Sequence, residues 1–247
     1  MRMRRAVSIR LPACALACLL LALAPARADE RITLHFNERP PYMVPGADGS
    51  ASGLTATPAR QAFAAAGIAV RWAQTPTTRQ LAVIRDNEGL DCAIGWFRKP
   101  DREAFAKFSK PIYRDRPTVV LAHAAFAAER QLADLLRRPG VTVLVKDNFS
   151  YGPMIDALLA EKRASVLRTS AENQQMVRMV AERRVDMMFA AEEEAQHLLS
   201  LAGNAAQGLR VLHFDDVPSG ERRHLMCSKR VPDALLDRLN AAIPAID

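Results

Sequence analysis

Side chains that commonly carry out catalysis or bind metals are scattered along this 247-residue chain rather than grouped in motifs. The five histidines lie far apart, with no His-Glu-x-x-His pattern and no spacing typical of metal ligands. A Gly-x-Ser-x-Gly elbow, a phosphate-binding P-loop and a Gly-x-Gly-x-x-Gly turn are absent as well. An acidic cluster is present at Glu192, Glu193 and Glu194, but such a cluster is equally typical of a helix start. We therefore expect no metal, no cofactor and no catalytic residue.

The cysteines offer one pair that could form a disulfide. Of the four cysteines, Cys14 and Cys18 belong to an N-terminal apolar stretch, which leaves Cys92 and Cys227. Two cysteines in an oxidising compartment can form one disulfide. Cysteine is also often buried as a small hydrophobic residue. The residues alone leave both interpretations open.

The N-terminus is typical of a secretory signal. Residues 1–10 are basic, residues 11–24 form an unbroken apolar run, and Ala26 and Ala28 place small residues where a signal peptidase reads them. The run is shorter than the about 20 residues that span a bilayer. Lipidation at Cys18 is less favoured, because the mature chain would then begin with more apolar residues. We expect cleavage after Ala28, a periplasmic location and no stable membrane insertion.

The net charge of +7 depends largely on this leader. Residues 1–28 contain five arginines and no acid, so the remaining 29 basic and 27 acidic side chains nearly balance. A nucleic-acid-binding domain usually keeps a basic stripe on its folded part. Nucleic acid is therefore not an expected partner.

Strand-like and helix-like segments alternate from residue 31 onward, which favours an α/β fold with mostly parallel sheets flanked by helices. The pattern restarts near residue 122, which indicates two lobes: 29–121 for lobe 1, 122–217 for lobe 2, and 218–247 as a return to lobe 1. The expected strands are 31–36, 68–72, 90–96, 117–122, 141–145, 165–167, 186–190, 209–214 and 224–228. The expected helices are 57–66, 78–87, 131–137, 152–162, 172–183, 192–201 and 232–243.

One stretch is more specific than this alternation. Residues 91–103 read DCAIGWFRKPDRE, and residues 105–113 read FAKFSKPIY. The first lobe also contains PPY at 40–42, and the second contains RVDMMFAAEEEAQHLL at 184–199. In order and spacing, these segments resemble the periplasmic solute-binding proteins of family 3, the polar amino-acid receptors of ABC importers. The resemblance implies two α/β lobes joined by crossover strands, with a ligand cleft between them.

The resemblance also implies roles for residues after the third expected strand. Arg102 matches the arginine that grips the ligand's carboxylate, and a planar guanidinium suits that task because it forms two parallel hydrogen bonds. Trp96 and Phe97 replace small hydroxyl residues of the family. Adjacent strand residues point to opposite faces, so we expect one ring in the cleft and the other in the core. The segment is one residue short, so Arg98 is a candidate to share the anion-binding role.

Other positions depart from the family pattern. Arg39 replaces the aromatic that stacks on the ligand, with Tyr42 as the nearest remaining ring. In lobe 2, Asn148 or Ser150 is expected to cap the helix at 152–162 and leave backbone N–H groups facing an anion. The acid that pairs with the ligand's ammonium aligns with Ala191, with Glu192 adjacent. These departures put α-amino-acid specificity in doubt and leave an anionic or zwitterionic solute as the expected ligand.

In the fold that the resemblance implies, the C-terminal strand returns to lobe 1 beside the third strand. Cys92 and Cys227 would then lie on neighbouring strands about 4.8 Å apart, close to the separation that a disulfide prefers.

The leading hypothesis is a monomeric, non-enzymatic periplasmic protein that binds a small polar solute by lobe closure and delivers it to an ABC importer permease or a sensor protein. The first alternative is a lyase on the same scaffold, similar to cyclohexadienyl dehydratase, with Glu192 or Glu193 as acid or base. The second is a degenerate interaction module whose cleft is filled by Trp96 and Phe97.

Overall fold

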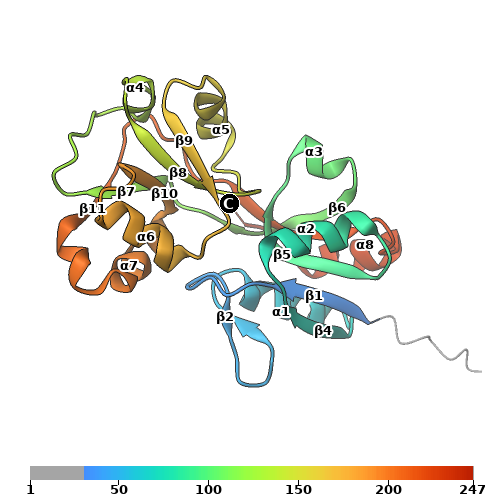
Figure 1. Ribbon diagram of the computed structural model, residues 1–247. Helices are drawn as coiled ribbons and strands as arrows, with labels where there is room; N and C mark the ends of the chain where they lie inside the picture. The colour runs from blue at the N-terminus through green and yellow to red at the C-terminus, as the bar shows by residue number, and fades with distance from the viewer. Residues whose placement is uncertain (1–30, 247) are drawn as a thin grey trace, which may run out of the picture. The chain divides into compact units, whose positions relative to one another are not determined.

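The computed structural model describes residues 31–246, and the expected signal segment 1–28 with its cleavage site lies outside these described residues. Two five-stranded sheets, each flanked by helices, form the two lobes of the described chain (Figure 1). Among residues 31–246, no helix has the length and apolar character needed to cross a membrane.

The sheet of lobe 1 has the strand order β4-β1-β5-β12-β6. Its strands are β1 (Ile32–Phe36), β4 (Val70–Gln74), β5 (Asp91–Phe97), β6 (Ala106–Arg114) and β12 (Arg222–Ser228). Its helices are α1 (Ala56–Ala65), α2 (Thr77–Asp86), α3 (Pro100–Glu103) and α8 (Asp233–Ala242), and a short ribbon pairs β2 (Val44–Pro45) with β3 (Ala51–Ser52).

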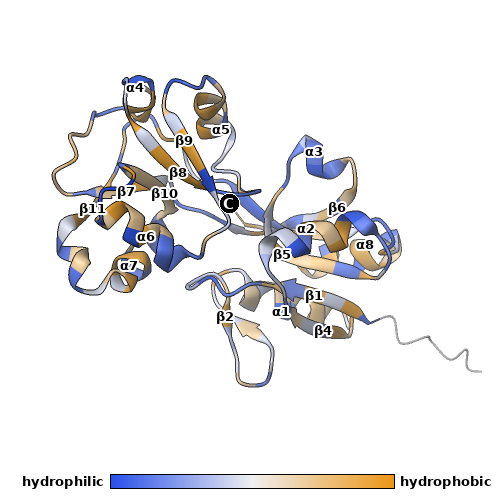
Figure 2. Ribbon diagram, viewed as in Figure 1, coloured by the Kyte–Doolittle hydropathy of each residue, from blue (hydrophilic) through white to orange (hydrophobic). Residues whose placement is uncertain are grey.

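The sheet of lobe 2 has the order β11-β7-β10-β8-β9. Its strands are β7 (Thr118–His123), β8 (Thr142–Lys146), β9 (Ser165–Thr169), β10 (Met187–Ala191) and β11 (Leu209–Leu212). Its helices are α4 (Leu132–Arg137), α5 (Pro153–Ala160), α6 (Asn173–Ala181) and α7 (Glu192–Leu201), followed by a 3-10 turn (Gly203–Gly208). Figure 2 shows β8 as largely hydrophobic, in keeping with burial on both faces of a central strand.

Both sheets are mixed. The prediction of parallel pairing holds for β1 with β4 and β5, and for β8 with β9 and β10. The strands next to the lobe crossings add antiparallel pairs, namely β12 with β5 and β6, and β7 with β10 and β11. These pairs are antiparallel because β7 and β12 enter their sheets directly from the other lobe. Parallel neighbours are instead joined by a helix that packs on the sheet.

Two segments carry the chain between the lobes. Residues 115–117 join β6 to β7, and residues 213–221 join β11 to β12. All of β7 lies in the lobe 2 sheet, so the first crossing precedes residue 118, and the expected boundary at 121/122 was a few residues late. The two segments touch, since the Asp115 N–H donates to the Glu221 carbonyl. At Gly220 a Cβ would collide with the carbonyl oxygens of Asp115 and Arg116, so only glycine permits this approach.

The core of each lobe lies on both faces of its sheet. In lobe 1, one cluster packs α1 and α8 against residues such as Leu34 and Leu225, and a second packs α2 against Ala93 and Met226. In lobe 2, α4 and α5 cover one face of the sheet while α6 and α7 cover the other. Helices on both faces explain why the central strands are almost wholly apolar.

Cys92 in β5 and Cys227 in β12 are directly opposite each other in the sheet register and are joined by a disulfide. Both residues are fully buried. The bond closes a loop of sequence separation 135 that contains all of lobe 2. It therefore ties the return strand to the sheet that the chain left before its first crossing.

Replacing both cysteines by serine is expected to lower the free energy of unfolding by about 4–5 kcal/mol, because a disulfide closing so long a loop restricts the unfolded chain strongly. Urea unfolding of the chain from residue 29 onward, with and without reductant, measures this loss. Thiol titration of the denatured, unreduced protein should find no free thiol. Two free thiols per chain would contradict the disulfide.

Candidate functional site

A cavity lies between the lobes and takes its walls from both of them. The space between its walls is about 890 Å³ when the solvent at its open mouth is included. Lobe 1 contributes the end of β5, Arg102 of α3 and the loop after β1, while lobe 2 contributes the loop after β8 and the start of α7. The charged lining residues are Arg39, Arg102, Asp115, Lys146, Glu194 and Arg223.

Arg102 is positioned by the short helix α3, directly after β5. Its side chain is buried, with 7% of the residue exposed, and its guanidinium lies 4.8 Å from the centre of the Trp96 ring. It donates to the Phe97 carbonyl in lobe 1 and to the Asn148 carbonyl in lobe 2, each at 3.0 Å. Burial lowers the pKa of Arg102, against the opposing effect of Asp101 and Asp156. Within residues 31–246, Arg102 forms no ion pair, so this buried cation lacks a counter-ion.

The rings before Arg102 are oriented by a bulge in β5. Gly95 has φ +80° and no partner in β12, because Ile94 pairs with Leu225 and Trp96 pairs with His224. The extra residue places Trp96 in the same apolar cluster as Ala93, although strict alternation would put it on the face of Ile94. The Trp96 indole N–H donates to the Gln80 side chain.

One of the two rings was expected in the core and the other in the cleft. Trp96 occupies both environments, since it belongs to an apolar cluster and also lines the cavity. Phe97 is half-buried, lines the cavity and lies 4.5 Å below the Arg223 guanidinium. Both rings form part of the wall, and the cavity remains beside them.

An ion pair joins the lobes at the cavity. Nε and Nη2 of Arg39 donate to the two carboxylate oxygens of Glu194, at 2.7 and 2.6 Å. Both side chains are almost fully buried. Burial alone would lower the pKa of Arg39, but the Glu194 carboxylate outweighs it and raises that pKa. Arg39 also lies over the rings of Tyr42 and Phe149. Arg39 was expected to contact the ligand, but its guanidinium is instead paired with Glu194 of the protein itself.

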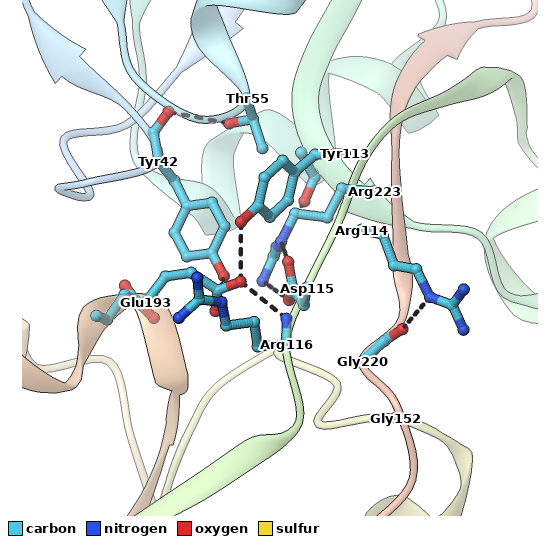
Figure 3. Close-up of polar contacts among 12 residues, drawn as sticks. Tyr42, Thr55, Tyr113, Arg114, Asp115, Arg116, Gly152, Glu193, Gly220 and Arg223 are labelled. Carbon is cyan, nitrogen blue, oxygen red and sulfur yellow. Dashed lines mark hydrogen bonds and ion pairs between the residues drawn. The ribbon is translucent and has the colours of Figure 1, made fainter. Parts of the chain in front are cut away.

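Glu193 makes a second set of contacts between the lobes (Figure 3). Its carboxylate accepts hydrogen bonds from the hydroxyls of Tyr42 and Tyr113, at 3.0 and 2.9 Å, and from the Arg116 N–H in the first crossing segment, at 2.8 Å. Burial raises the pKa of both tyrosines, so both hydroxyls keep their protons and act as donors. Tyr42, expected in the cleft, is 1% exposed, and its hydroxyl is used in this contact.

Asp115 and Arg223 form a further buried pair where the two crossing segments meet (Figure 3). Nε and Nη2 of Arg223 donate to both oxygens of Asp115, each at 2.6 Å. Burial raises the pKa of Asp115, and the opposing effect of Arg223 offsets this only in part. The guanidinium also donates to the Gly95 carbonyl and lies 4.4 Å from the Tyr42 ring. Arg223 therefore connects the crossing segments to the bulge that orients Trp96.

The loop after β8 supplies the lobe 2 wall. Asn148 has φ +61° and presents its carbonyl to Arg102. Ser150 donates to Asp156, and Gly152 precedes the first residue of α5 without a side-chain cap. The expected cap of this helix by Asn148 or Ser150 was wrong, because Asp156 accepts the local donors from within the first turn. Both residues nevertheless line the cavity.

Lys146 and Tyr151 complete this wall. The Tyr151 hydroxyl accepts a hydrogen bond from the Lys146 N–H, and burial raises the pKa of Tyr151 to about 12. Burial also lowers the pKa of the Lys146 ammonium, whose nearest acid is the largely exposed Glu172 at 3.6 Å. The cation at Lys146 is therefore weakly paired.

Three expected site residues lie outside the cavity, namely Arg98, Glu192 and Tyr42, whose hydroxyl donates to Glu193. Arg98 is exposed and pairs with Glu103 on the surface of lobe 1, because the chain turns into α3 directly after it. Glu192 pairs with His213 at 2.7 Å, because the first residue of α7 faces the second crossing segment. Residues that the sequence did not single out are Lys146, Arg223, Asp115 and Glu194. Glu194 belongs to an acidic triplet, and the sequence offered no signal for which member faces the cavity. Among residues 31–246, no group of His, Cys, Asp or Glu has the arrangement of a metal site.

No protein-family model matches the sequence, and no curated protein sequence matches it. Solved structures are similar. An ancestral arginine-binding protein bound to arginine aligns with a TM-score of 0.68 and 17% identity over 86% of this chain and 89% of that one. A structure from glutathione import via GshT and the cystine ABC importer TcyBC of Streptococcus mutans has a TM-score of 0.69 and 15% identity over 87% of both chains.

A histidine kinase sensor domain similar to periplasmic binding proteins has a TM-score of 0.68 and 15% identity, over 86% of this chain and 87% of that one. The chain has the two-lobed periplasmic-binding fold. At this level of identity, the similarity establishes the arrangement of the lobes, and the role of the cleft has to be argued from its own residues.

Asp156 links the lobes through a carboxylate whose pKa is shifted by folding, so the stability of the protein should depend on pH. Burial would raise this pKa, but hydrogen bonds from Lys99 of lobe 1, Ser150 and the Tyr151 N–H outweigh burial and lower it. The folded state thus binds the proton less tightly than the unfolded chain. The stabilisation is complete above the ordinary pKa of 3.8 and is lost as the pH falls through the lowered folded-state value.

Asp156→Asn should therefore lower the free energy of unfolding by about 1–2 kcal/mol at pH 7, and the difference should vanish in acid. Urea unfolding across pH 2.5–7 measures it. Lys99→Met serves as the control, because it removes only the bond between the lobes and should give a smaller loss. A difference that is constant with pH would exclude the role of the Asp156 carboxylate.

Proposed function

We propose that this protein is a non-enzymatic binding protein that holds a small organic carboxylate between its lobes. The main support for this proposal is Arg102, a buried guanidinium on the cavity wall with no acidic partner among residues 31–246. A buried charge without a counter-charge is costly, and a bound carboxylate would supply one. Its bonds to Phe97 and Asn148 use two of its five N–H donors, which leaves donors for the ligand.

The position of Arg102 supports binding by lobe closure. It belongs to lobe 1 but already bonds the backbone of lobe 2, so a ligand held by Arg102 would contact both lobes. Two ion pairs also join the lobes, namely Arg39 with Glu194 and Lys99 with Asp156. Movement about the two crossing segments would open and close the cavity.

The proposed setting is periplasmic. The expected signal at 1–28, together with a disulfide between Cys92 and Cys227, fits an exported protein. Structures with the same fold include a component of glutathione import and a kinase sensor domain. Delivery of the ligand to an ABC importer permease or to a sensor protein is the corresponding role for this chain.

Neither alternative gains support from the cavity. Glu192 and Glu193, the candidates for a lyase, do not line it, and the carboxylate of Glu193 is held by two tyrosines and a backbone N–H. The degenerate module requires Trp96 and Phe97 to fill the cleft, whereas both form its wall.

Arg102→Ala is expected to weaken carboxylate binding by about 2–5 kcal/mol, and Arg102→Lys should not restore it, because an ammonium cannot form the two parallel bonds of a guanidinium. A thermal-shift screen of carboxylates and amino acids identifies a ligand, and calorimetry then measures its affinity. Arg98→Ala is the control on the same loop outside the cavity and should bind as the wild type does. Near wild-type affinity in Arg102→Ala would remove Arg102 from the site.

Trp96 is expected to report binding, because the ligand would contact the guanidinium that lies over its ring. The chain has only two tryptophans, so Trp72→Phe isolates the signal. Titration of that variant with the identified ligand should change its fluorescence, and the change should disappear when Arg102→Ala is added. Unchanged fluorescence at saturation would show that Trp96 senses only the lobe core.

A further inference from the structure

The acids of the cavity are already neutralised by the protein itself. Among the described residues that line the cavity, the acidic ones are Glu194 and Asp115. Both oxygens of Glu194 accept from Arg39, and both oxygens of Asp115 accept from Arg223. Each pair therefore uses the bidentate geometry that would otherwise be available to a ligand cation.

A ligand ammonium would instead meet cations. Besides the two paired arginines, the wall contains Arg102 without an acidic partner and Lys146 with a weak one. An ammonium that leaves water is stabilised best by a carboxylate, and an additional cation among these positive side chains would be repelled. The electrostatics of the cavity therefore favour a carboxylate and disfavour a zwitterion.

The rest of the lining suits an apolar body. Lobe 2 contributes Phe149, Phe189, Met176, Met188 and Leu198, and lobe 1 contributes Trp96 and Phe97. Aromatic and methionine side chains accommodate aromatic or aliphatic groups of varied shape. Polar contacts are then required mainly where the carboxylate is bound.

We propose that the cleft selects organic carboxylates that carry no ammonium group, and that Arg39 sets this specificity by occupying Glu194. This inference rests on the proposed binding function and narrows its ligand class. Arg39 acts here as a specificity-determining residue, because it removes the acid on which an α-ammonium would depend.

Matched probes that differ in the ammonium alone test the ligand class. Calorimetry on the wild type compares 3-phenylpropionate with L-phenylalanine and glutarate with L-glutamate. In at least one pair the compound without the amino group should bind, about 30-fold or more tightly than its amino-acid partner, because the partner would bury an unpaired charge.

Arg39→Met tests the role of Arg39, since it leaves Glu194 free to accept an ammonium. The ratio of affinities should then shift toward the amino acid by about tenfold or more. The double variant Arg39→Met with Glu194→Met removes both charges and should not show this shift. Arg137→Met is the matched control: Arg137 forms the same two-bonded pair with Glu161, but on the surface of lobe 2.

The outcomes separate the two proposals. An amino acid that binds the wild type as tightly as its partner, or more tightly, would overturn the specificity and leave the binding function intact. No binding by any probe or by any carboxylate in the thermal-shift screen would overturn both. If Arg39→Met is too unstable to assay, Arg39→Gln replaces it, because glutamine keeps a hydrogen-bond donor for Glu194 but removes the positive charge. A shift in the same direction is expected, and none would exclude Arg39.

Discussion

A charge that is buried between two lobes must meet an opposite charge, and this requirement organises the cleft. Arg39 with Glu194 and Arg223 with Asp115 satisfy it through paired hydrogen bonds. Removing one partner of such a pair typically costs about 3–5 kcal/mol, whereas replacing both with apolar groups can be neutral. The pairs are thus weak evidence of net stability but strong determinants of which lobe surfaces fit together. Arg102 is the exception, and that exception is the basis of the proposed anion binding.

In the proposed function, the same contacts would relate lobe position to ligand binding. Glu193 and Glu194, at the start of α7, contact lobe 1 through Tyr42, Tyr113 and Arg39. Opening the cleft would break these bonds and expose their groups to water, which can hydrate them. The closed arrangement is consequently favoured by several moderate interactions rather than by the ligand alone. A ligand on Arg102 adds to this set without displacing any member.

The crossing segments connect this electrostatic arrangement to the fold. Gly220 allows the two segments to approach at their backbones, and Asp115 and Arg223 lie where they meet. Arg223 also bonds the Gly95 carbonyl at the bulge of β5. The bulge in turn places Trp96 under Arg102. The disulfide between Cys92 and Cys227 fixes β12 against β5 beside this point. The Gly95 bulge, Arg223 and the disulfide therefore all belong to the adjacent strands β5 and β12.

The sequence by itself determined the alternation of strands and helices, the division into two lobes and the place of Arg102 after a buried strand, because periodicity and turn residues are local properties. Its resemblance to a known family indicated that the C-terminal strand returns beside Cys92. Tertiary structure alone decided which glutamate faces the cavity. Successive residues of a helix point about 100° apart, so Glu192, Glu193 and Glu194 reach His213, two tyrosines and Arg39, respectively. The rotation of α7 about its axis is set by packing against the lobe 2 sheet, and the Gly95 bulge is set by pairing with β12. Neither constraint is written in the local sequence.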